Sequence, residues 1–143
     1  MSRAAAIALL VLLILTGCSS PEQKLRSAAA QSARQAASEV STARLAVEQL
    51  RTHHLWTRAA GQIVKDAETG VESASSSFSS QQPSTATSTQ LYEQVTKTLD
   101  DAQTAVTAVR IALGNDNLTA AEQQLPALTK SAADLARIGE LAK

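Results

Sequence analysis

Residues 20–50 read SPEQKLRSAAAQSARQAASEVSTARLAVEQL, and this stretch decides the fold. Ser20, Pro21 and Gln23 are typical of a helix start, because a hydroxyl can cap the first turn and proline fits the first helical position. An apolar stripe follows at helical spacing and consists of Leu25, Ala29, Ala33, Ala36, Val40, Ala43, Val47 and Leu50. From Ala33 onward its steps alternate between three and four residues, which is a heptad seam. Half of the seam is alanine, so a partner helix must approach closely.

Three more apolar stripes with helical spacing follow along the chain. The second contains Ala60, Val64, Ala67, Val71, Ala74 and Phe78. The third contains Leu91, Val95, Leu99, Ala102, Val106, Val109 and Leu113. The fourth contains Leu118, Ala121, Leu125, Leu128, Ala132, Leu135 and Ile138. Because the sequence has no run of alternating β-branched residues, it predicts an all-α fold.

The segment between the first two stripes, residues 51–57, allows two interpretations. The first helix either continues through it or ends there in a turn. A comparison of the two halves of the chain favours the turn, because a shift of 63 positions superimposes their apolar residues. It places Ala36, Ala43 and Leu50 on Leu99, Val106 and Leu113.

We therefore predict two αα-hairpins, at 20–79 and 87–142, that pack as one antiparallel four-helix bundle. A Ser/Thr-rich linker at about 75–89, which contains Pro83, joins the hairpins. The alternative is a three-helix arrangement, in which one long helix over 20–79 packs against a shorter hairpin.

Glycine and proline are expected to affect the second and fourth helices. Gly61 and Gly70 weaken the second helix by up to ~1 kcal/mol each relative to alanine. The fourth helix is expected to begin at Thr119, which forms a capping box with Glu122. Pro126 lies inside that helix and is expected to kink it, because proline lacks a backbone N–H.

The N-terminus predicts the cellular location. After Arg3, residues 4–15 form a continuous apolar run, which is shorter than the ~20 residues that a membrane-spanning helix needs. The run fits the apolar region of an export signal. Residues Leu15, Thr16, Gly17 and Cys18 then resemble the lipobox of bacterial prolipoproteins. The other interpretation is an ordinary signal peptide followed by a chance cysteine.

The resemblance to bacterial lipoproteins implies that residues 1–17 are a signal peptide and that residues 18–143 are the mature helical domain. It implies cleavage before Cys18, whose thiol carries fatty acyl chains such as palmitate. Two or more acyl chains anchor a protein stably. The expected location is the outer face of the plasma membrane, or the outer membrane in a Gram-negative envelope. In Gram-negative lipoproteins, a serine after the lipidated cysteine, here Ser19, favours transfer of the protein to the outer membrane. The resemblance implies nothing about activity.

Composition and missing motifs exclude several function classes. The chain has 13 basic and 13 acidic side chains and therefore lacks the basic surplus of a nucleic-acid binder. Its single cysteine excludes a disulfide scaffold. The sequence contains no Glu-x-x-His pair, no His-Glu-x-x-His helix, no Gly-rich phosphate loop and no nucleophile elbow. We therefore expect no enzyme activity, no cofactor and no metal site.

His53, His54 and Trp56 form the candidate contact site. The two histidines are adjacent, and neighbouring residues on a helix point about 100° apart, so they are poorly placed to hold a metal together. Trp56 is the chain's only tryptophan, a residue type that is enriched at interfaces. It is expected either to cap the end of the alanine-rich core or to anchor a contact with a partner.

Charge is distributed unevenly. Residues 18–60 carry a net charge of +3, and residues 61–143 carry −4. The basic first part follows the predicted lipid anchor and could rest on anionic headgroups. The preferred interpretation is an ordinary solvated helix face that the acidic helices of the same bundle balance.

Two functions therefore stand as hypotheses. The leading one is a lipid-anchored, non-catalytic interaction or structural module that meets an envelope protein or the cell wall. The alternative is a helical bundle that binds or senses a small ligand in an apolar slot between helices, with Trp56, His54 or Tyr92 at its mouth. Self-association through the heptad seams is compatible with either.

Overall fold

The computed structural model describes residues 20–142. Four long helices and two short ones account for nearly all of this part of the chain. They are α2 (Pro21–Arg51), α3 (Thr57–Ser79), α4 (Ala86–Gly114), the short α5 (Leu118–Glu122), α6 (Leu125–Gly139) and the 3₁₀ helix η2 (Glu140–Ala142). Within residues 20–142 there is no strand. The predicted all-α class is confirmed.

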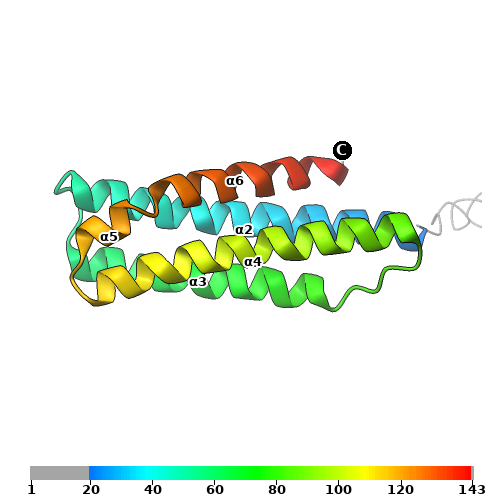
Figure 1. Cartoon of the computed structure of the whole chain (residues 1–143), viewed down its shortest axis with the longest axis horizontal. Helices are drawn as coiled ribbons and strands as arrows, with labels where there is room; N and C mark the ends of the chain where they lie inside the picture. Colours follow the sequence, from blue (N-terminus) through cyan, green and yellow to red (C-terminus); the bar gives the residue numbers. More distant parts are fainter. Residues whose placement is uncertain (1–19, 143) are drawn as a thin grey trace, which may run out of the picture.

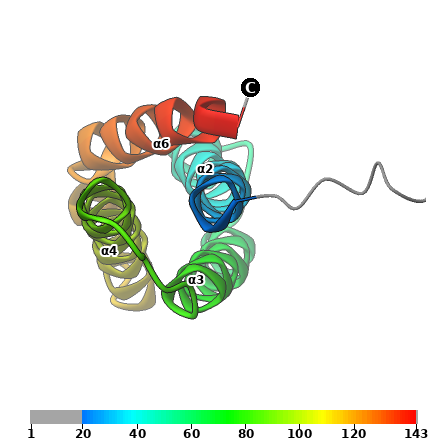
Figure 2. The same ribbon diagram turned by 90° about the vertical axis from the view of Figure 1, so that its right-hand side faces the viewer.

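The long helices pack as a four-helix bundle in which consecutive helices run in opposite directions (Figure 1). Viewed along the bundle, they occupy four corners in the order α2, α3, α4 and α6 (Figure 2). Helix α2 packs against both α3 and α6, and α4 closes the ring between them. The chain turns between Arg51 and Thr57, so the alternative with one long helix over 20–79 is wrong.

The predicted stripes form the core. Every residue of the first two stripes is buried, from Leu25 to Phe78. In the fourth stripe Leu128, Leu135 and Ile138 are buried, whereas Ala132 is half-buried. Six of the eleven buried residues of α2 are alanine. The helix can therefore lie close to its neighbours, and it contacts α4 across the diagonal as well as the two adjacent helices.

Hydroxyl groups define where α2 and α4 begin. Ser20 Oγ accepts a hydrogen bond from the backbone N–H of Gln23 at 3.2 Å, and Pro21 takes the first helical position. Thr85 and Ser88 form a reciprocal capping box, in which Ser88 N–H donates to Thr85 Oγ1 and Thr85 N–H donates to Ser88 Oγ. Each of these caps satisfies backbone groups that a helix end leaves without a partner.

The non-helical connection between the hairpins spans 80–85 only, which is narrower than the expected linker of about 75–89. Phe78 is buried and holds the last turn of α3 on the core. Ser79 and Ser80 donate their hydroxyls to the backbone carbonyls of Ser76 and Ser77. Burial of one aromatic ring thus keeps a serine-rich segment helical despite its low intrinsic propensity.

Two expectations for the fourth helix are wrong. Its first residues are capped by Asn117, whose Oδ1 accepts from the N–H of Ala120 at 3.0 Å, and not by a box between Thr119 and Glu122. Pro126 does not kink a continuous helix but divides it, because the proline ring would clash with the carbonyl four residues before it. The chain therefore stops as α5 and restarts as α6, with proline in the first turn.

We predict that Ala36→Leu destabilises the bundle by about 1–3 kcal/mol, because Ala36 is fully buried where α2 meets its neighbours and a larger side chain overpacks the contact. Ala136→Leu, on the exposed side of α6, is the matched control and should change stability by less than about 0.5 kcal/mol. Chemical denaturation monitored by circular dichroism measures both. Equal unfolding midpoints for the two variants would contradict a core that depends on close helix approach.

Candidate functional site

The predicted lipidation residue Cys18 and the lipobox residues Leu15, Thr16 and Gly17 lie outside the described residues, so cleavage and lipidation stay predictions. The described chain starts at Ser20, at the beginning of α2. Within residues 20–142, no helix has the length and hydropathy that crossing a membrane requires.

The turn after α2 contains all three candidate contact residues. His53 N–H donates to the carbonyl of Leu50, and His54 N–H donates to that of Gln49 at 2.9 Å. Together these two bonds form a Schellman motif, which places His53 in the left-handed region with φ 60°. That conformation costs a non-glycine residue roughly 1 kcal/mol or more, so the turn is strained at His53.

The turn after α4 repeats the same motif. Asp116 N–H donates to the carbonyl of Leu113, Asn117 N–H donates to that of Ala112, and Asp116 has φ 53°. Asp116 lies 63 positions after His53, the same shift that superimposes the apolar residues of the two halves. The repeat inferred from the stripes therefore extends to the backbone of the two turns, which lie at the same end of the bundle (Figure 1).

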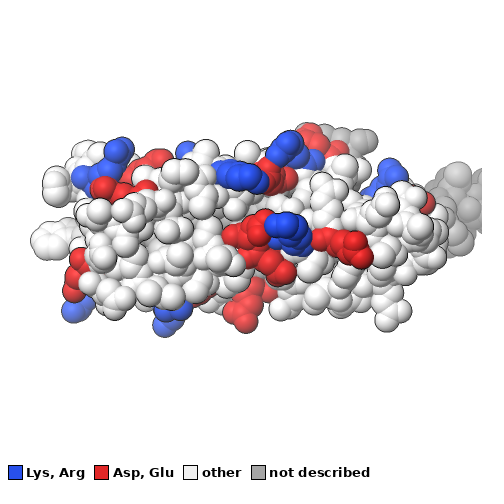
Figure 3. All heavy atoms as spheres, viewed as in Figure 1, with Lys and Arg blue, Asp and Glu red and all other residues white. Residues whose placement is uncertain are grey.

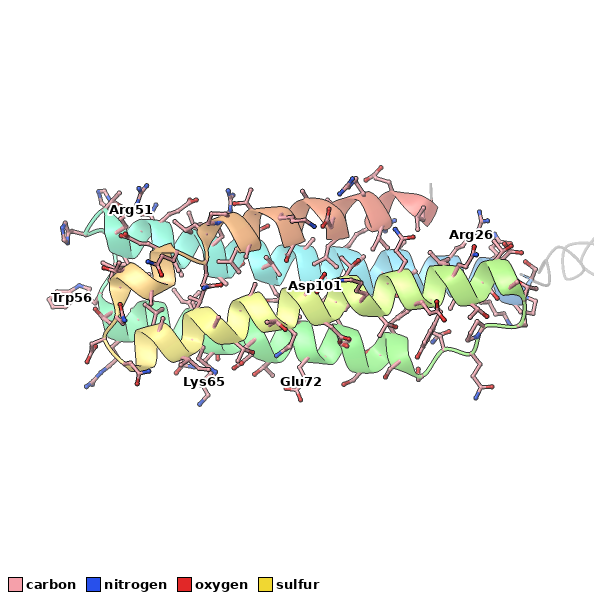
Figure 4. All side chains as sticks on the ribbon, in the orientation of Figure 1. Arg26, Arg51, Trp56, Lys65, Glu72 and Asp101 are labelled. Atoms are coloured by element: carbon pink, nitrogen blue, oxygen red, sulfur yellow. The ribbon has the colours of Figure 1, made fainter. Side chains whose placement is uncertain are left out.

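Trp56 is the most exposed large apolar residue of this turn, with 85% of its surface accessible. The expectation that it caps the end of the core is wrong. Leu55 packs against the core in its place, and Trp56 precedes α3 in an extended conformation with its ring directed away from the bundle (Figure 4). An indole left this exposed forgoes the burial that usually makes tryptophan stabilising.

His53 and His54 are also exposed. The ring Nδ1 of His54 lies 2.8 Å from Thr52 Oγ1, which orients that imidazole beside the turn. We call Arg51, His53, His54 and Trp56 the distal tip, because they lie at the end of the bundle opposite the start of α2. Within residues 20–142 there is no group of three or more His, Cys, Asp or Glu side chains that could hold a metal ion.

The other aromatic residues have structural roles. Phe78 and Tyr92 stack with ring centroids 5.2 Å apart. The Tyr92 hydroxyl donates to the carbonyl of Ser79 at 3.2 Å. The pair fastens the end of α3 to the start of α4 across the short connection, so Tyr92 lies away from the distal tip.

Sequence reasoning missed an open groove between α3 and α4, of about 480 Å³, which we call the distal groove. Its lining includes Gly61, Lys65 and Glu68 from α3 and Arg110 and Gly114 from α4. Arg110 Nε lies 2.5 Å from Glu68 Oε2, and the Thr107 hydroxyl donates to Glu68 Oε1 at 2.6 Å. Gly61, an unfavourable residue inside the predicted second helix, was a signal on this face of α3, but it did not show which helix would lie opposite.

A second open groove, of about 470 Å³, lies between α4 and α6 toward the other end of the bundle, and we call it the proximal groove. Its charged rim is internally paired. Lys130 Nζ lies 2.5 Å from Asp134 Oδ2, and Arg137 pairs with the same carboxylate. The hydrogen bond from Lys130, with that from Arg137, lowers the pKa of Asp134 although partial burial opposes the shift. These contacts keep Asp134 ionised. The rim has two cations for one carboxylate, but both cations are paired with that carboxylate.

No family model, curated protein or solved structure matches the chain. The assignment of a functional surface therefore depends on the residues of this chain alone.

We predict that His53→Gly raises the free energy of unfolding by roughly 0.5–1 kcal/mol, because glycine adopts a left-handed conformation without a Cβ penalty. His54→Gly is the matched control and should bring no such gain, since His54 lacks a positive φ. Urea denaturation of the three proteins gives the comparison. A His53→Gly protein no more stable than wild type would show that the turn is not strained at this residue.

Proposed function

We propose that the protein is a lipid-anchored, non-catalytic interaction module of a bacterial envelope, with the distal tip as its contact surface. The observation that carries this proposal is the 85% exposure of Trp56 at the end of the bundle farthest from the start of α2. An acyl group on Cys18 would attach the chain two residues before Ser20, next to that start. Anchor and contact surface would then lie at opposite ends of the same bundle.

The length of α2 sets the distance between the proposed anchor and the distal tip. The helix has 31 residues and therefore spans about 46 Å at 1.5 Å per residue. Because α3, α4 and α6 brace it along its length, the bundle acts as a spacer rather than as a flexible linker. A protein anchored at one end would hold Trp56 several tens of ångströms from its membrane, where a partner in the envelope can meet it.

The chemistry of the tip fits protein recognition. Tryptophan and arginine are the residue types most enriched among those that dominate binding energy at interfaces, and the tip presents Trp56 with Arg51. Within residues 20–142, Arg51 forms no ion pair. A partner that covers the indole would recover the burial that the free protein lacks, and it would find a cation available beside it.

The absence of a catalytic role is part of the proposal. The only two histidines lie in one exposed turn. The His54 ring lies against the hydroxyl of Thr52, on the same turn, and neither histidine lines the distal or the proximal groove. We propose no cofactor, metal or nucleic-acid partner. The proposed location is the outer face of the plasma membrane, or the outer membrane if the envelope is Gram-negative.

The small-ligand alternative has less support. It expects an enclosed apolar slot with Trp56, His54 or Tyr92 at its mouth. The distal and proximal grooves are both open to solvent, and none of these three residues lines either of them. Alanine, valine and leucine side chains fill the space between the helices along the described part of the bundle.

We predict that the mature protein starts at Cys18 and carries a diacylglyceryl group on its thiol. Mass spectrometry of the N-terminal peptide from membrane-extracted protein measures this directly. Cys18→Ser should abolish the modification and leave the helical content of the bundle unchanged. An unmodified Cys18 in protein taken from the membrane fraction would refute lipid anchoring.

We predict that the partner is held through Trp56. A photo-crosslinking amino acid at Thr57, next to the indole and exposed, should capture a reproducible envelope protein in living cells. Trp56→Ala should reduce that crosslink about tenfold or more, as expected for a dominant interface residue. Leu141→Ala removes a 46% exposed apolar side chain at the other end and should leave the crosslink unchanged. Equal crosslinking in both variants would exclude the distal tip as the contact surface.

A further inference from the structure

The distal groove begins one turn into α3, beside the distal tip. Its α3 wall is one face of the helix, because Gly61, Lys65 and Glu68 are separated by four and then three residues. Its α4 wall holds Arg110, Leu113 and Gly114. Helices α3 and α4 are direct neighbours in the bundle, so the groove is the furrow between two antiparallel helices and runs along both of them.

The groove is hollow because two positions lack side chains. A Cβ added at Gly61 or at Gly114 would meet no atom within 4 Å. Neither glycine has a positive φ. Gly61 nevertheless costs the interior of α3 up to ~1 kcal/mol relative to alanine. Nothing inside the bundle requires this glycine, and its effect is to leave backbone open to close approach from outside.

The charge of the groove is incompletely balanced. The side chain of Glu68 is only 17% exposed; it forms an ion pair with Arg110 and accepts a hydrogen bond from the Thr107 hydroxyl. Within residues 20–142, Lys65 and Arg58 form no ion pair. They are seven positions apart and therefore share a face of α3. Lys65 projects from α3 in the half of the bundle that also carries Trp56 (Figure 4).

The sequence around the groove also has more basic than acidic side chains. From Gln49 to Lys65 the chain has three Lys or Arg side chains and no Asp or Glu. The carboxylates that flank this segment in the sequence are engaged: Glu48 pairs with Arg44 at 3.7 Å, and Asp66 accepts a hydrogen bond from Gln62 at 2.8 Å. Elsewhere the charges alternate: over the middle of α4 and along α6, acidic and basic side chains lie side by side (Figure 3).

We infer that the distal groove binds an acidic helical segment of a partner protein. The groove is shaped for a helix, since its glycines admit the ridge of a third helix between α3 and α4. Lys65 and Arg58 select acidic side chains along that helix. Such a helix would leave the groove beside Trp56. This inference rests on the proposed interaction function and specifies the chemistry of its partner.

The test measures binding of defined peptides to the purified full chain. The probe is a fluorescein-labelled amphipathic peptide of about 15 residues, roughly 22 Å as a helix, with leucine at every third or fourth position and glutamate elsewhere. The comparison peptide has lysine in place of each glutamate. Fluorescence anisotropy should show that the acidic peptide binds at least about tenfold more tightly, and that salt weakens its binding.

Three variants localise the binding. Lys65→Glu reverses a charge of the groove, and Gly61→Leu fills the groove without changing its charge; each should weaken binding of the acidic peptide about tenfold. Lys24→Glu is the matched control, because Lys24 is also exposed and in no ion pair within residues 20–142 but lies near the start of α2. It should leave binding unchanged. Circular dichroism establishes that Gly61→Leu stays folded, and Lys65→Glu tests the site independently.

Each other outcome overturns the inference. Equal binding of the acidic and basic peptides would exclude charge selection, and equal effects of Lys65→Glu and Lys24→Glu would exclude this groove. If light scattering shows self-association that Lys65→Glu abolishes, the occupant is a second copy of this chain. Peptide binding does not depend on the anchor or on Trp56, so its failure is distinct from failure of the N-terminal mass measurement or of the Thr57 crosslink.

Discussion

Close approach of α2 to its neighbours is the constraint on which the rest of the structure depends. The buried face of this helix is largely alanine, and Ala29, Ala33, Ala36 and Ala43 have no accessible surface. Each methyl group adds little apolar area by itself. The stability of the contact must therefore come from dense packing of many short side chains along 31 residues. This explains why α2 contacts all three other long helices, and why a small change of side-chain volume in α2 should destabilise the whole bundle.

An alanine seam sets the distance between helices but specifies their axial positions poorly, because its surface is nearly uniform. Specific side-chain contacts at different positions along the bundle axis fix the axial positions of the helices. Arg34 Nε donates to the carbonyl of Gly139 at 3.0 Å and fixes the end of α6 on α2. Glu68, held by Arg110, fixes α3 on α4 near the distal end, and the stacked pair of Phe78 and Tyr92 does so at the other end. The bundle combines unspecific close packing with a few specific contacts.

The long elements could be predicted from the sequence because apolar periodicity reports burial directly, as the fully buried stripes of α2 and α3 show. The prediction was wrong where a local choice depended on competition between signals. Asn117 was a better cap than Thr119, and Pro126 restarted a helix instead of kinking one. Trp56 was misjudged for another reason: hydrophobicity predicts burial, but burial also needs a place in the core, and Leu55 already occupied it. The distal groove could not be predicted, because it depends on which faces of α3 and α4 meet.

The two ends of the bundle differ in how completely their surface groups are satisfied. Near the start of α2 and the end of α6, Glu22 pairs with Arg26, and Asp134 pairs with both Lys130 and Arg137. At the other end an indole is exposed, a histidine is strained, and cations lie beside a groove that two glycines keep open. Unused interaction capacity costs a free protein stability, and it is retained where a partner can use it. The exposed indole and the strained turn occur at the distal end alone among these contacts, which supports the proposal that this end is the contact surface.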